Sequence, residues 1–265
     1  MKKFLCLACL LLVMSFILTG CGGGTSGEDT SWEDISAKGQ IVIGLDDSFP
    51  PMGFRDGNDL IGYDIDLAKE ACSRLGITAV FQPISWLQKD TELSSKNIDC
   101  IWNGFTMQGR ENDYLFTDAY MTNRQILVVM EDSDIASLAD MAGKKLALQQ
   151  ESSAQAALDE SADFKDSLAE VVTFDDNLKA LMDLEIGQSD AVLMDEIVAR
   201  YNIEKQGKPY MVLDEELASE SYGVGFRLGD KSLRDKFNET LNAMKADGKM
   251  EEISMTWFGK NTIAE

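Results

Sequence analysis

Runs of apolar residues that are typical of buried strands alternate with amphipathic runs that are typical of helices along most of this chain. Residues 40–45, QIVIGL, are nearly all apolar, as expected for a strand with both faces buried. The stretch YDIDLAKEACSRLG then places Ile65, Ala68, Cys72 and Leu75 at helical spacing and ends at a glycine. This alternation predicts an α/β fold in which the strands run parallel.

The alternation continues far enough to predict two lobes. A chain of 265 residues is long enough for one large or two medium domains, and a second series of patterns begins near residue 144. The strand patterns cover residues 78–83, 100–102, 125–130, 144–150, 170–174, 190–195 and 222–227, and the helical patterns cover residues 152–161, 175–187 and 196–207, with two more from Ser232 and Lys249. We therefore predict two α/β lobes.

The N-terminus has the pattern of a bacterial lipoprotein signal peptide. Lys2 and Lys3 precede an apolar run that is short for a permanent membrane span, and the run ends in LTGC, where cleavage precedes a cysteine that becomes lipidated. We predict that residues 1–20 are a signal peptide, that Cys21 carries lipid such as palmitate, and that residues 21–38 form a flexible tether. A plain signal peptide followed by an incidental cysteine is the alternative.

The chain is strongly acidic, with a formal net charge of −22. Removal of residues 1–20, which hold two lysines and no acidic residue, makes this charge −24. Because nucleic-acid binding needs a basic surface, we expect no nucleic-acid partner. Cys72 and Cys100 are the two cysteines beyond Cys21, and we expect two buried thiols, with a disulfide as the alternative.

Polar and charged side chains follow several of the predicted strands. Ligands of open α/β sheets bind beyond the carboxyl ends of the strands, so we expect these side chains to line one cleft. An arginine, short hydrogen-bond donors and carboxylates suit an amino acid zwitterion, with Arg110 binding its carboxylate and Asp195 its ammonium. A surface ion pair of Arg110 with Glu111 or Asp113 is the alternative. The residues that follow the strands are Asp46, Phe49, Asn103, Gly104, Thr106, Arg110, Gln149, Ser153 and Asp195, of which Gly104 offers its backbone N–H and Phe49 its ring.

Several of these residue types have other common uses. Asp46 also suits a turn or a helix cap, and Phe49 and Trp86 also suit an apolar core. Asp64 and Asp66 precede an apolar helical pattern, so we expect them to stabilise the helix start and not to bind a ligand.

Three stretches also resemble the polar amino acid solute-binding proteins of ABC importers. IGLDDSFPPMGFRDGNDLIGYDIDLAKEACSRLG resembles the opening of that family, IDCIWNGFTMQGRENDYLFTDAYM resembles its strand, threonine and arginine block, and SDAVLMDEIVARY resembles a segment of its second lobe. The resemblance implies a two-lobed periplasmic-binding-protein-like fold of type II, with the ligand cleft between the lobes and two hinge crossovers. Lobe 1 would comprise residues 39–125 and 218–265, and lobe 2 residues 126–217, with hinges near residues 123–129 and 213–225.

The resemblance also implies roles for single residues. Arg110 would bind the α-carboxylate of one L-amino acid, and Asp195 would bind its α-ammonium. Further contacts are implied for Gly104, Thr106 and Ser153 at the carboxylate, for Phe49 and Trp86 around the ligand side chain, and for Asp46 and Asn103 at its tip. Together with Gln149 these residues form the expected binding set.

The sequence is compatible with several amino acids as the ligand. Family members usually have glycine where Glu151 stands, and this acid is either a partner for a cationic ligand group or a solvated residue. Asp46, Asn103 and Gln149 suit a polar or cationic tip. Glutamine, arginine, lysine, histidine and cystine therefore all remain candidate ligands.

An enzyme is less well supported than a binding protein. The sequence has no histidine, which removes histidine-based triads and histidine metal ligands. We expect no catalytic activity, no cofactor and no metal. The expected partners are an L-amino acid and the ABC permease and ATPase of an importer. The protein is expected to be an extracytoplasmic monomer that is anchored to the cell membrane by lipid. A dehydratase-type lyase resembling cyclohexadienyl dehydratase and a sensory binding module are the alternatives.

Overall fold

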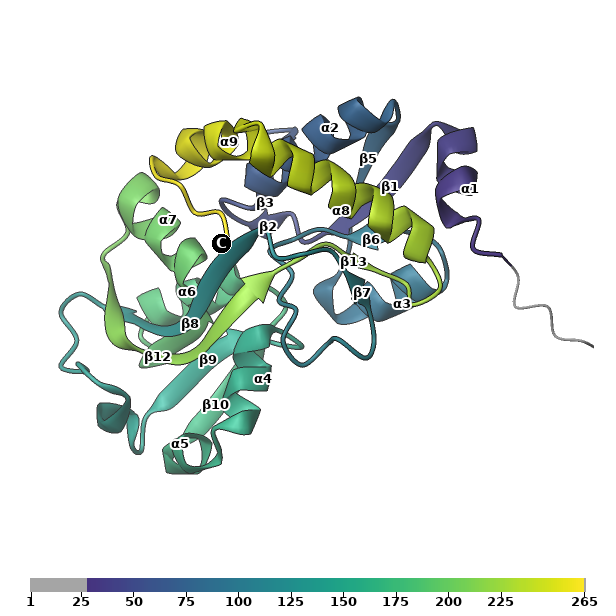
Figure 1. Ribbon diagram of the computed structural model, residues 1–265. Helices are drawn as coiled ribbons and strands as arrows, with labels where there is room; N and C mark the ends of the chain where they lie inside the picture. The colour runs from purple at the N-terminus through teal and green to yellow at the C-terminus, as the bar shows by residue number, and fades with distance from the viewer. Residues whose placement is uncertain (1–27, 265) are drawn as a thin grey trace, which may run out of the picture.

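The computed structural model describes residues 28–264, which form two lobes, each built on a five-stranded sheet (Figure 1). The sheet of the first lobe has the order β5-β1-β6-β13-β7, and that of the second has the order β10-β9-β11-β8-β12. The first sheet consists of β1 (Gln40–Leu45), β5 (Thr78–Pro83), β6 (Cys100–Ile101), β7 (Leu115–Phe116) and β13 (Gly225–Phe226). The second consists of β8 (Met121–Met130), β9 (Lys145–Gln149), β10 (Glu170–Phe174), β11 (Ala191–Asp195) and β12 (Tyr210–Tyr222).

Helices flank both sheets, and a small three-stranded sheet lies beside the first. Each of the predicted helical patterns corresponds to a helix in the structure. The first lobe holds α1 (Ser31–Lys38), α2 (Tyr63–Leu75), η1 (Trp86–Gln88), α3 (Lys89–Ser94), α8 (Lys231–Ala246), α9 (Lys249–Phe258) and the strands β2 (Ser48–Phe49), β3 (Gly53–Asp56) and β4 (Asp59–Ile61). The second lobe holds η2 (Leu138–Met141), α4 (Ser153–Glu160), α5 (Ala162–Ser167), α6 (Asn177–Glu185) and α7 (Glu196–Gln206).

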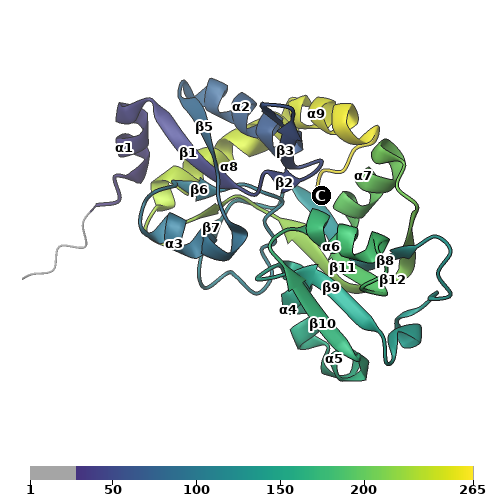
Figure 2. The same cartoon turned by 180° about the vertical axis from the view of Figure 1, so that it is seen from behind.

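The second sheet is buried on both faces, which explains its nearly continuous apolar strands. Along β8, Ile126 and Val128 join one apolar cluster, whereas Leu127 and Val129 join another. The first cluster includes residues of α6 and α7, and the second includes residues of α4. Successive side chains of a strand point to opposite faces of its sheet, so the two clusters lie on opposite faces. Helices therefore cover both faces of this sheet, as Figures 1 and 2 show.

The prediction that the strands run parallel is only partly correct. The pairs β1–β5, β1–β6, β9–β10 and β9–β11 are parallel. In contrast, β8 runs antiparallel to β11 and β12, and β13 runs antiparallel to β6 and β7. The reason is the path of the chain, because it leaves the first lobe along β8 and returns to it along β12.

The prediction of a flexible tether over residues 21–38 is wrong from Ser31 onward. Residues 31–38 form α1, in which Ile35 is buried. The Ser31 hydroxyl lies 3.0 Å from that of Ser232, at the start of α8, and the two helices pack together. This helix is short and mostly polar, so its sequence shows little helical periodicity of apolar residues. Residues 1–20, Cys21 and the rest of the predicted tether before residue 28 lie outside the described residues.

Cys72 and Cys100 are buried free thiols, so the prediction of two thiols is confirmed. Burial raises the pKa of the Cys72 thiol to about 12. In the described part of the chain, no helix combines the length and the apolar character that a membrane span requires.

The start of α2 depends on Gly62. Its φ of 146° lies in a region that residues with a side chain rarely adopt, and a Cβ added there would lie 2.1 Å from the carbonyl oxygen of Met52. Gly57, in the turn between β3 and β4, also has a positive φ of 61°, but an added Cβ would have no atom within 4 Å.

Replacement of Gly62 by alanine is expected to lower the free energy of unfolding by about 2–4 kcal/mol, because both the backbone and the contact with Met52 must change. Gly57→Ala is the matched control, with an expected loss of about 1 kcal/mol from the positive φ alone. Equilibrium unfolding in urea, followed by circular dichroism, measures both values. Equal losses in the two variants would contradict this account of Gly62.

Candidate functional site

Residues from both lobes surround a small cavity at the junction of the lobes. Its volume is about 20 Å³. The first lobe contributes Phe49, Trp86, Asn103, Gly104, Thr106 and Arg110, and the second contributes Gln149, Ser152, Ser153 and Asp195. The structure therefore brings together nine of the ten residues that the sequence pattern and the resemblance placed in a binding site. The tenth, Asp46, does not line this cavity but is hydrogen-bonded to two of its residues, Asn103 and Gln149.

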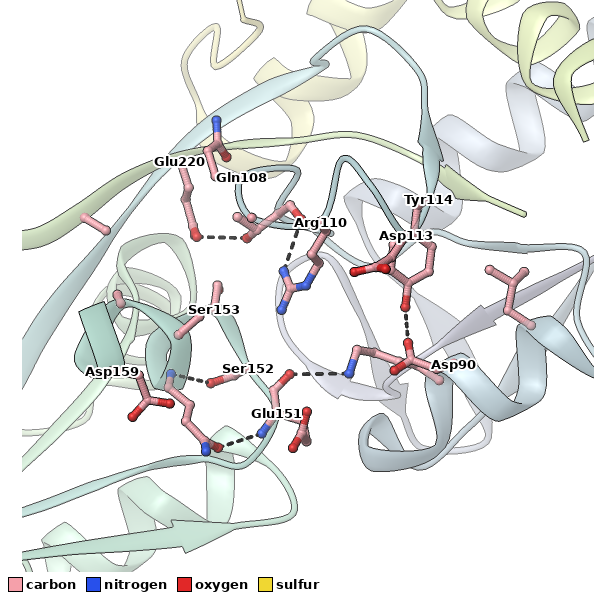
Figure 3. Close-up of a pocket in the computed structure, with 18 of the residues that line it drawn as sticks. Asp90, Gln108, Arg110, Asp113, Tyr114, Glu151, Ser152, Ser153, Asp159 and Glu220 are labelled. Atoms are coloured by element: carbon pink, nitrogen blue, oxygen red, sulfur yellow. Dashed lines mark hydrogen bonds between the residues drawn. The ribbon is translucent and has the colours of Figure 1, made fainter. Parts of the chain in front are cut away.

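A larger cleft of about 1010 Å³ adjoins the cavity (Figure 3). The two spaces share Thr106, Arg110, Ser152 and Ser153 in their walls. Because 20 Å³ is about the room that one water molecule needs, an organic ligand fits the inner cavity only if the lobes or the lining side chains move apart.

Arg110 is a half-buried cation that forms no ion pair within residues 28–264. Its Nη1 donates a hydrogen bond to the Thr106 carbonyl oxygen at 3.0 Å, and its guanidinium lies 5.0 Å from the centre of the Phe105 ring. Burial lowers the pKa of Arg110 from its usual value. The alternative of a surface pair with Glu111 or Asp113 is therefore not seen, and the guanidinium is left free to bind an anion.

Asp195 is a buried acid at the end of β11, with 4% of its surface exposed. Its Oδ1 accepts hydrogen bonds from Asn123 Nδ2 at 2.9 Å, Gln125 Nε2 at 3.0 Å and the Tyr222 hydroxyl at 2.6 Å. Burial, and then the nearby charge of Glu220, raise the pKa of Asp195 well above its usual range.

Glu220 belongs to the same site but was missed by the sequence reasoning. It is buried on β12, and its Oε2 accepts a hydrogen bond of 2.8 Å from the Thr106 hydroxyl. The available signal was its position two residues before Tyr222 in a strand, because such residues lie on the same face. Because the strand pattern was predicted only from residue 222, this signal was not used, whereas β12 in fact spans Tyr210–Tyr222.

Asp46 and Gln149 connect the two lobes. Gln149 Nε2 donates to Asp46 Oδ2 at 3.0 Å, and the Asp46 backbone N–H donates to Asn103 Oδ1 at 2.8 Å. Burial raises the pKa of Asp46 to about 6, since it outweighs the hydrogen bonds from Ser48 and Gln149.

A second connection between the lobes involves Glu151. Its carbonyl oxygen accepts hydrogen bonds from Trp86 Nε1 at 3.2 Å and from Lys89 Nζ at 3.5 Å. Its φ of 55° explains why a glycine suits this position, and its side chain is exposed. The structure therefore agrees with the solvated alternative for this acid.

Asp64 holds the loop that carries Gly104. Although it lies in the first turn of α2, as expected, the N-cap residue is Gly62, and Asp64 Oδ2 accepts the Gly104 backbone N–H at 2.6 Å. Gly104 has a φ of 53°, and a Cβ there would lie 3.1 Å from the rings of Phe49 and Tyr222. Burial raises the pKa of Asp64 to about 7, despite the bond from Gly104.

This arrangement defines a class of protein. Two α/β lobes joined by β8 and β12, with charged groups of both lobes around one cavity, form the architecture of a protein that closes on a small ligand. Residues 41–260 match the family model of bacterial extracellular solute-binding proteins, family 3. The chain therefore belongs to this family.

Individual relatives agree with this assignment. The chain is 30% identical to the L-cystine-binding protein TcyA of Bacillus subtilis (strain 168), over 98% of this chain and 99% of that protein. A substrate-binding protein of an ABC uptake transporter from Streptococcus pneumoniae, crystallised with bound histidine, has a TM-score of 0.87 and 36% identity, over 91% of this chain and 100% of that chain. The ancestral amino acid-binding protein AncCDT-1, a precursor of cyclohexadienyl dehydratase, has a TM-score of 0.78 and 29% identity, over 85% of this chain and 98% of that chain.

The pKa of Asp64 leads to a prediction about stability. An acid whose pKa is about 7 when folded and 3.8 when unfolded makes a contribution to the free energy of unfolding that decreases as the pH rises from about 4 to 7. Asp64→Asn keeps an acceptor for the Gly104 N–H but does not ionise. We expect the variant to gain stability relative to the wild type over this pH range, by at most about 4 kcal/mol.

Urea unfolding at several pH values measures this difference. Asp66→Asn, in the same helix turn but half-buried, is the control and is expected to follow the wild type. A constant difference between Asp64→Asn and the wild type from pH 4 to 7 would contradict the prediction.

Proposed function

We propose that this protein is the extracytoplasmic substrate-binding component of an amino acid ABC importer. It captures a polar or charged L-amino acid between its lobes and delivers it to a permease that is driven by an ATPase. The observation that carries the proposal is that Arg110 from the first lobe and Asp195 from the second line the same cavity. The relatives that bind cystine and histidine support the same ligand class.

The charges of the site suggest how binding proceeds. Arg110 binds the α-carboxylate of the ligand, and Asp195 binds the α-ammonium, so a zwitterion bridges the lobes. Since each lobe holds only one of these partners, the ligand stabilises the closed arrangement more than an open one. The same cavity supports contacts from Phe49 and Trp86 to the ligand side chain, and from Asn103, Gly104, Thr106, Gln149 and Ser153 to its polar groups, with Asp46 at its tip.

The long strands β8 and β12 are the proposed hinges. The lobe boundaries 125/126 and 217/218 fall inside them, and the two strands pair from Met130 to Met121 with register shifts between Val212 and Ala218. Such irregular pairing is where a strand bends most easily, so we place the bending there. We further propose that the protein works as a monomer.

A dehydratase-type activity is the second candidate. Its support is the similarity to a precursor of cyclohexadienyl dehydratase, together with the buried carboxyl groups of Asp195 and Glu220, which suit a proton transfer. Turnover of a prephenate-like acid would favour the enzyme, whereas binding of an amino acid without turnover favours the transport protein. The sensory module has no comparable observation in its favour.

Arg110→Ala and Asp195→Ala are expected to weaken amino acid binding by at least about a hundredfold, since each removes a buried group of opposite charge from one end of the ligand. The measurement is isothermal titration calorimetry after a thermal-shift screen of the twenty amino acids and cystine. Ligand that binds only the native state raises the melting temperature, so the same variants should lose that rise.

Arg74→Ala is the control, because Arg74 lies on the surface and pairs with Glu70 and Asp247. It is expected to bind like the wild type. A ligand-dependent rise in melting temperature that persists in both Arg110→Ala and Asp195→Ala would contradict the proposed function.

The proposed lipid anchor at Cys21 predicts a change in location. Cys21→Ser in the full chain is expected to move the protein from the membrane fraction to the soluble fraction, because the lipid would be attached to the Cys21 thiol, which the variant lacks. Fractionation followed by immunoblotting measures this, with Cys72→Ser as the control. An unchanged membrane fraction for Cys21→Ser would contradict lipidation at this cysteine.

A further inference from the structure

Two carboxyl groups share one buried site at the junction of the lobes. Asp195 of β11 and Glu220 of β12 are each 4% exposed, and β8 lies between their strands. In the sheet register, Asp195 is opposite Gln125 and Glu220 is opposite Asn123, both residues of β8. The geometry therefore points both carboxyl groups toward the same two amides.

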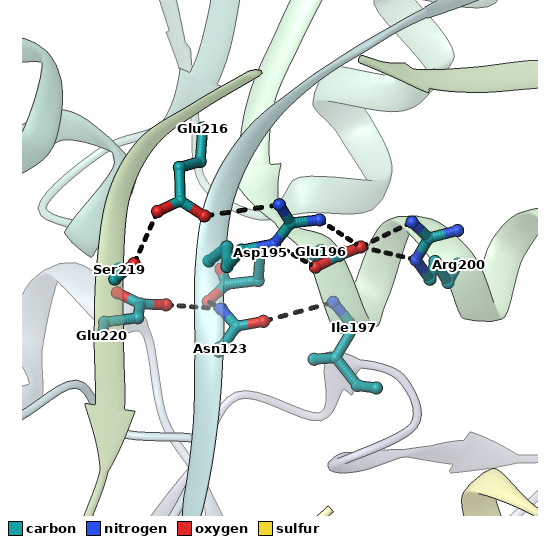
Figure 4. Close-up of polar contacts among 9 residues, drawn as sticks. Asn123, Asp195, Glu196, Ile197, Arg200, Glu216, Ser219 and Glu220 are labelled. Atoms are coloured by element: carbon teal, nitrogen blue, oxygen red, sulfur yellow. Dashed lines mark hydrogen bonds and ion pairs between the residues drawn. The ribbon is translucent and has the colours of Figure 1, made fainter. Parts of the chain in front are cut away.

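The two amides contact both acids. Asn123 Nδ2 donates to Asp195 Oδ1 at 2.9 Å and also to Glu220 Oε1 (Figure 4). Gln125 Nε2 donates to the same two atoms at 3.0 and 2.8 Å. Amides are neutral, so they orient the two carboxylates without neutralising their charges. Two buried carboxylates in this position need a shared proton or a cation.

No cation of the described residues meets this need. Neither Asp195 nor Glu220 forms an ion pair within residues 28–264. Arg110 of the first lobe is a cation on which the charges of both acids act, while Arg124 and Glu196, on the other side of β8, pair with each other at 2.7 Å. The hydroxyls of Thr106 and Tyr222 complete the surroundings, and both are neutral.

We propose that Glu220 is a second carboxylate of the ammonium site, and that the ammonium group of the ligand replaces a proton shared by Asp195 and Glu220. The ammonium enters and stays as –NH3+, and the shared proton leaves to solvent, so the charge of the buried site is unchanged. This inference rests on the proposed function and adds to it the role of Glu220 and the release of one proton on binding.

The position of the pair suits this role. Asp195 lines the inner cavity, whereas Glu220 lines the adjoining cleft, and Thr106 and Arg110 line both spaces. Glu220 also accepts a hydrogen bond from the Thr106 hydroxyl, so it lies at the cleft through which the ligand would enter (Figure 3). The raised pKa of Asp195, caused by burial and then by the charge of Glu220, agrees with a proton held by the pair.

Proton release on binding tests the proposal. Calorimetric titration of the purified protein with histidine, arginine and cystine, in two buffers of different ionisation enthalpy at pH 7, gives the number of protons released. For a ligand that binds, the wild type is expected to release about one proton, and Glu220→Gln fewer than about half as many, with binding retained through Asp195. Glu216→Gln, an exposed acid on the same strand, is the matched control and should follow the wild type. Equal proton release by Glu220→Gln and the wild type would overturn the proposal.

A second measurement needs no ligand. A shared proton means that the folded protein holds more protons than the unfolded chain, so stability decreases as the pH rises from 5 to 8. We expect the melting temperature of the wild type to decrease more steeply over this range than that of Glu220→Gln or Asp195→Asn. Equal slopes in all three proteins would overturn the proposal. If no amino acid binds the wild type, the proposed function fails, and these slopes alone decide whether the pair shares a proton.

Discussion

The charges buried at the junction of the lobes are the constraint on which the site depends. Arg110 lies on one side, Asp195 and Glu220 lie on the other, and within the described residues none of them has an ion-pair partner. Removing charges from water is unfavourable unless a partner of opposite charge is close. In the proposed function, a ligand with both charges supplies the partners that these groups lack.

The groups around these charges are held by the first lobe. Asp64 binds the Gly104 N–H, Gly104 leaves room for Phe49 and Tyr222, and the Tyr222 hydroxyl in turn donates to Asp195. Gly62 allows α2 to begin where Asp64 reaches that loop. A site that is positioned in this way loses little order when it binds its ligand.

Contacts between the lobes are few and polar at the cavity. They include Gln149 with Asp46 and Trp86 with the carbonyl of Glu151. A typical hydrogen bond contributes only about 1 kcal/mol, so such contacts oppose a separation of the lobes only weakly. The continuous strands β8 and β12 keep the lobes attached while those contacts change.

The sequence by itself determined the alternating α/β elements, because periodic apolar residues are a local property of the chain, and it also determined which polar residues follow the strands. Only the tertiary structure placed α1 against α8, turned β8 and β12 antiparallel, and brought Glu220 to Asp195, which precedes it by many residues. It also showed that Asp64, in the first turn of α2, accepts the backbone N–H of Gly104. These outcomes depend on which distant segments pack together, and no local pattern carries that information.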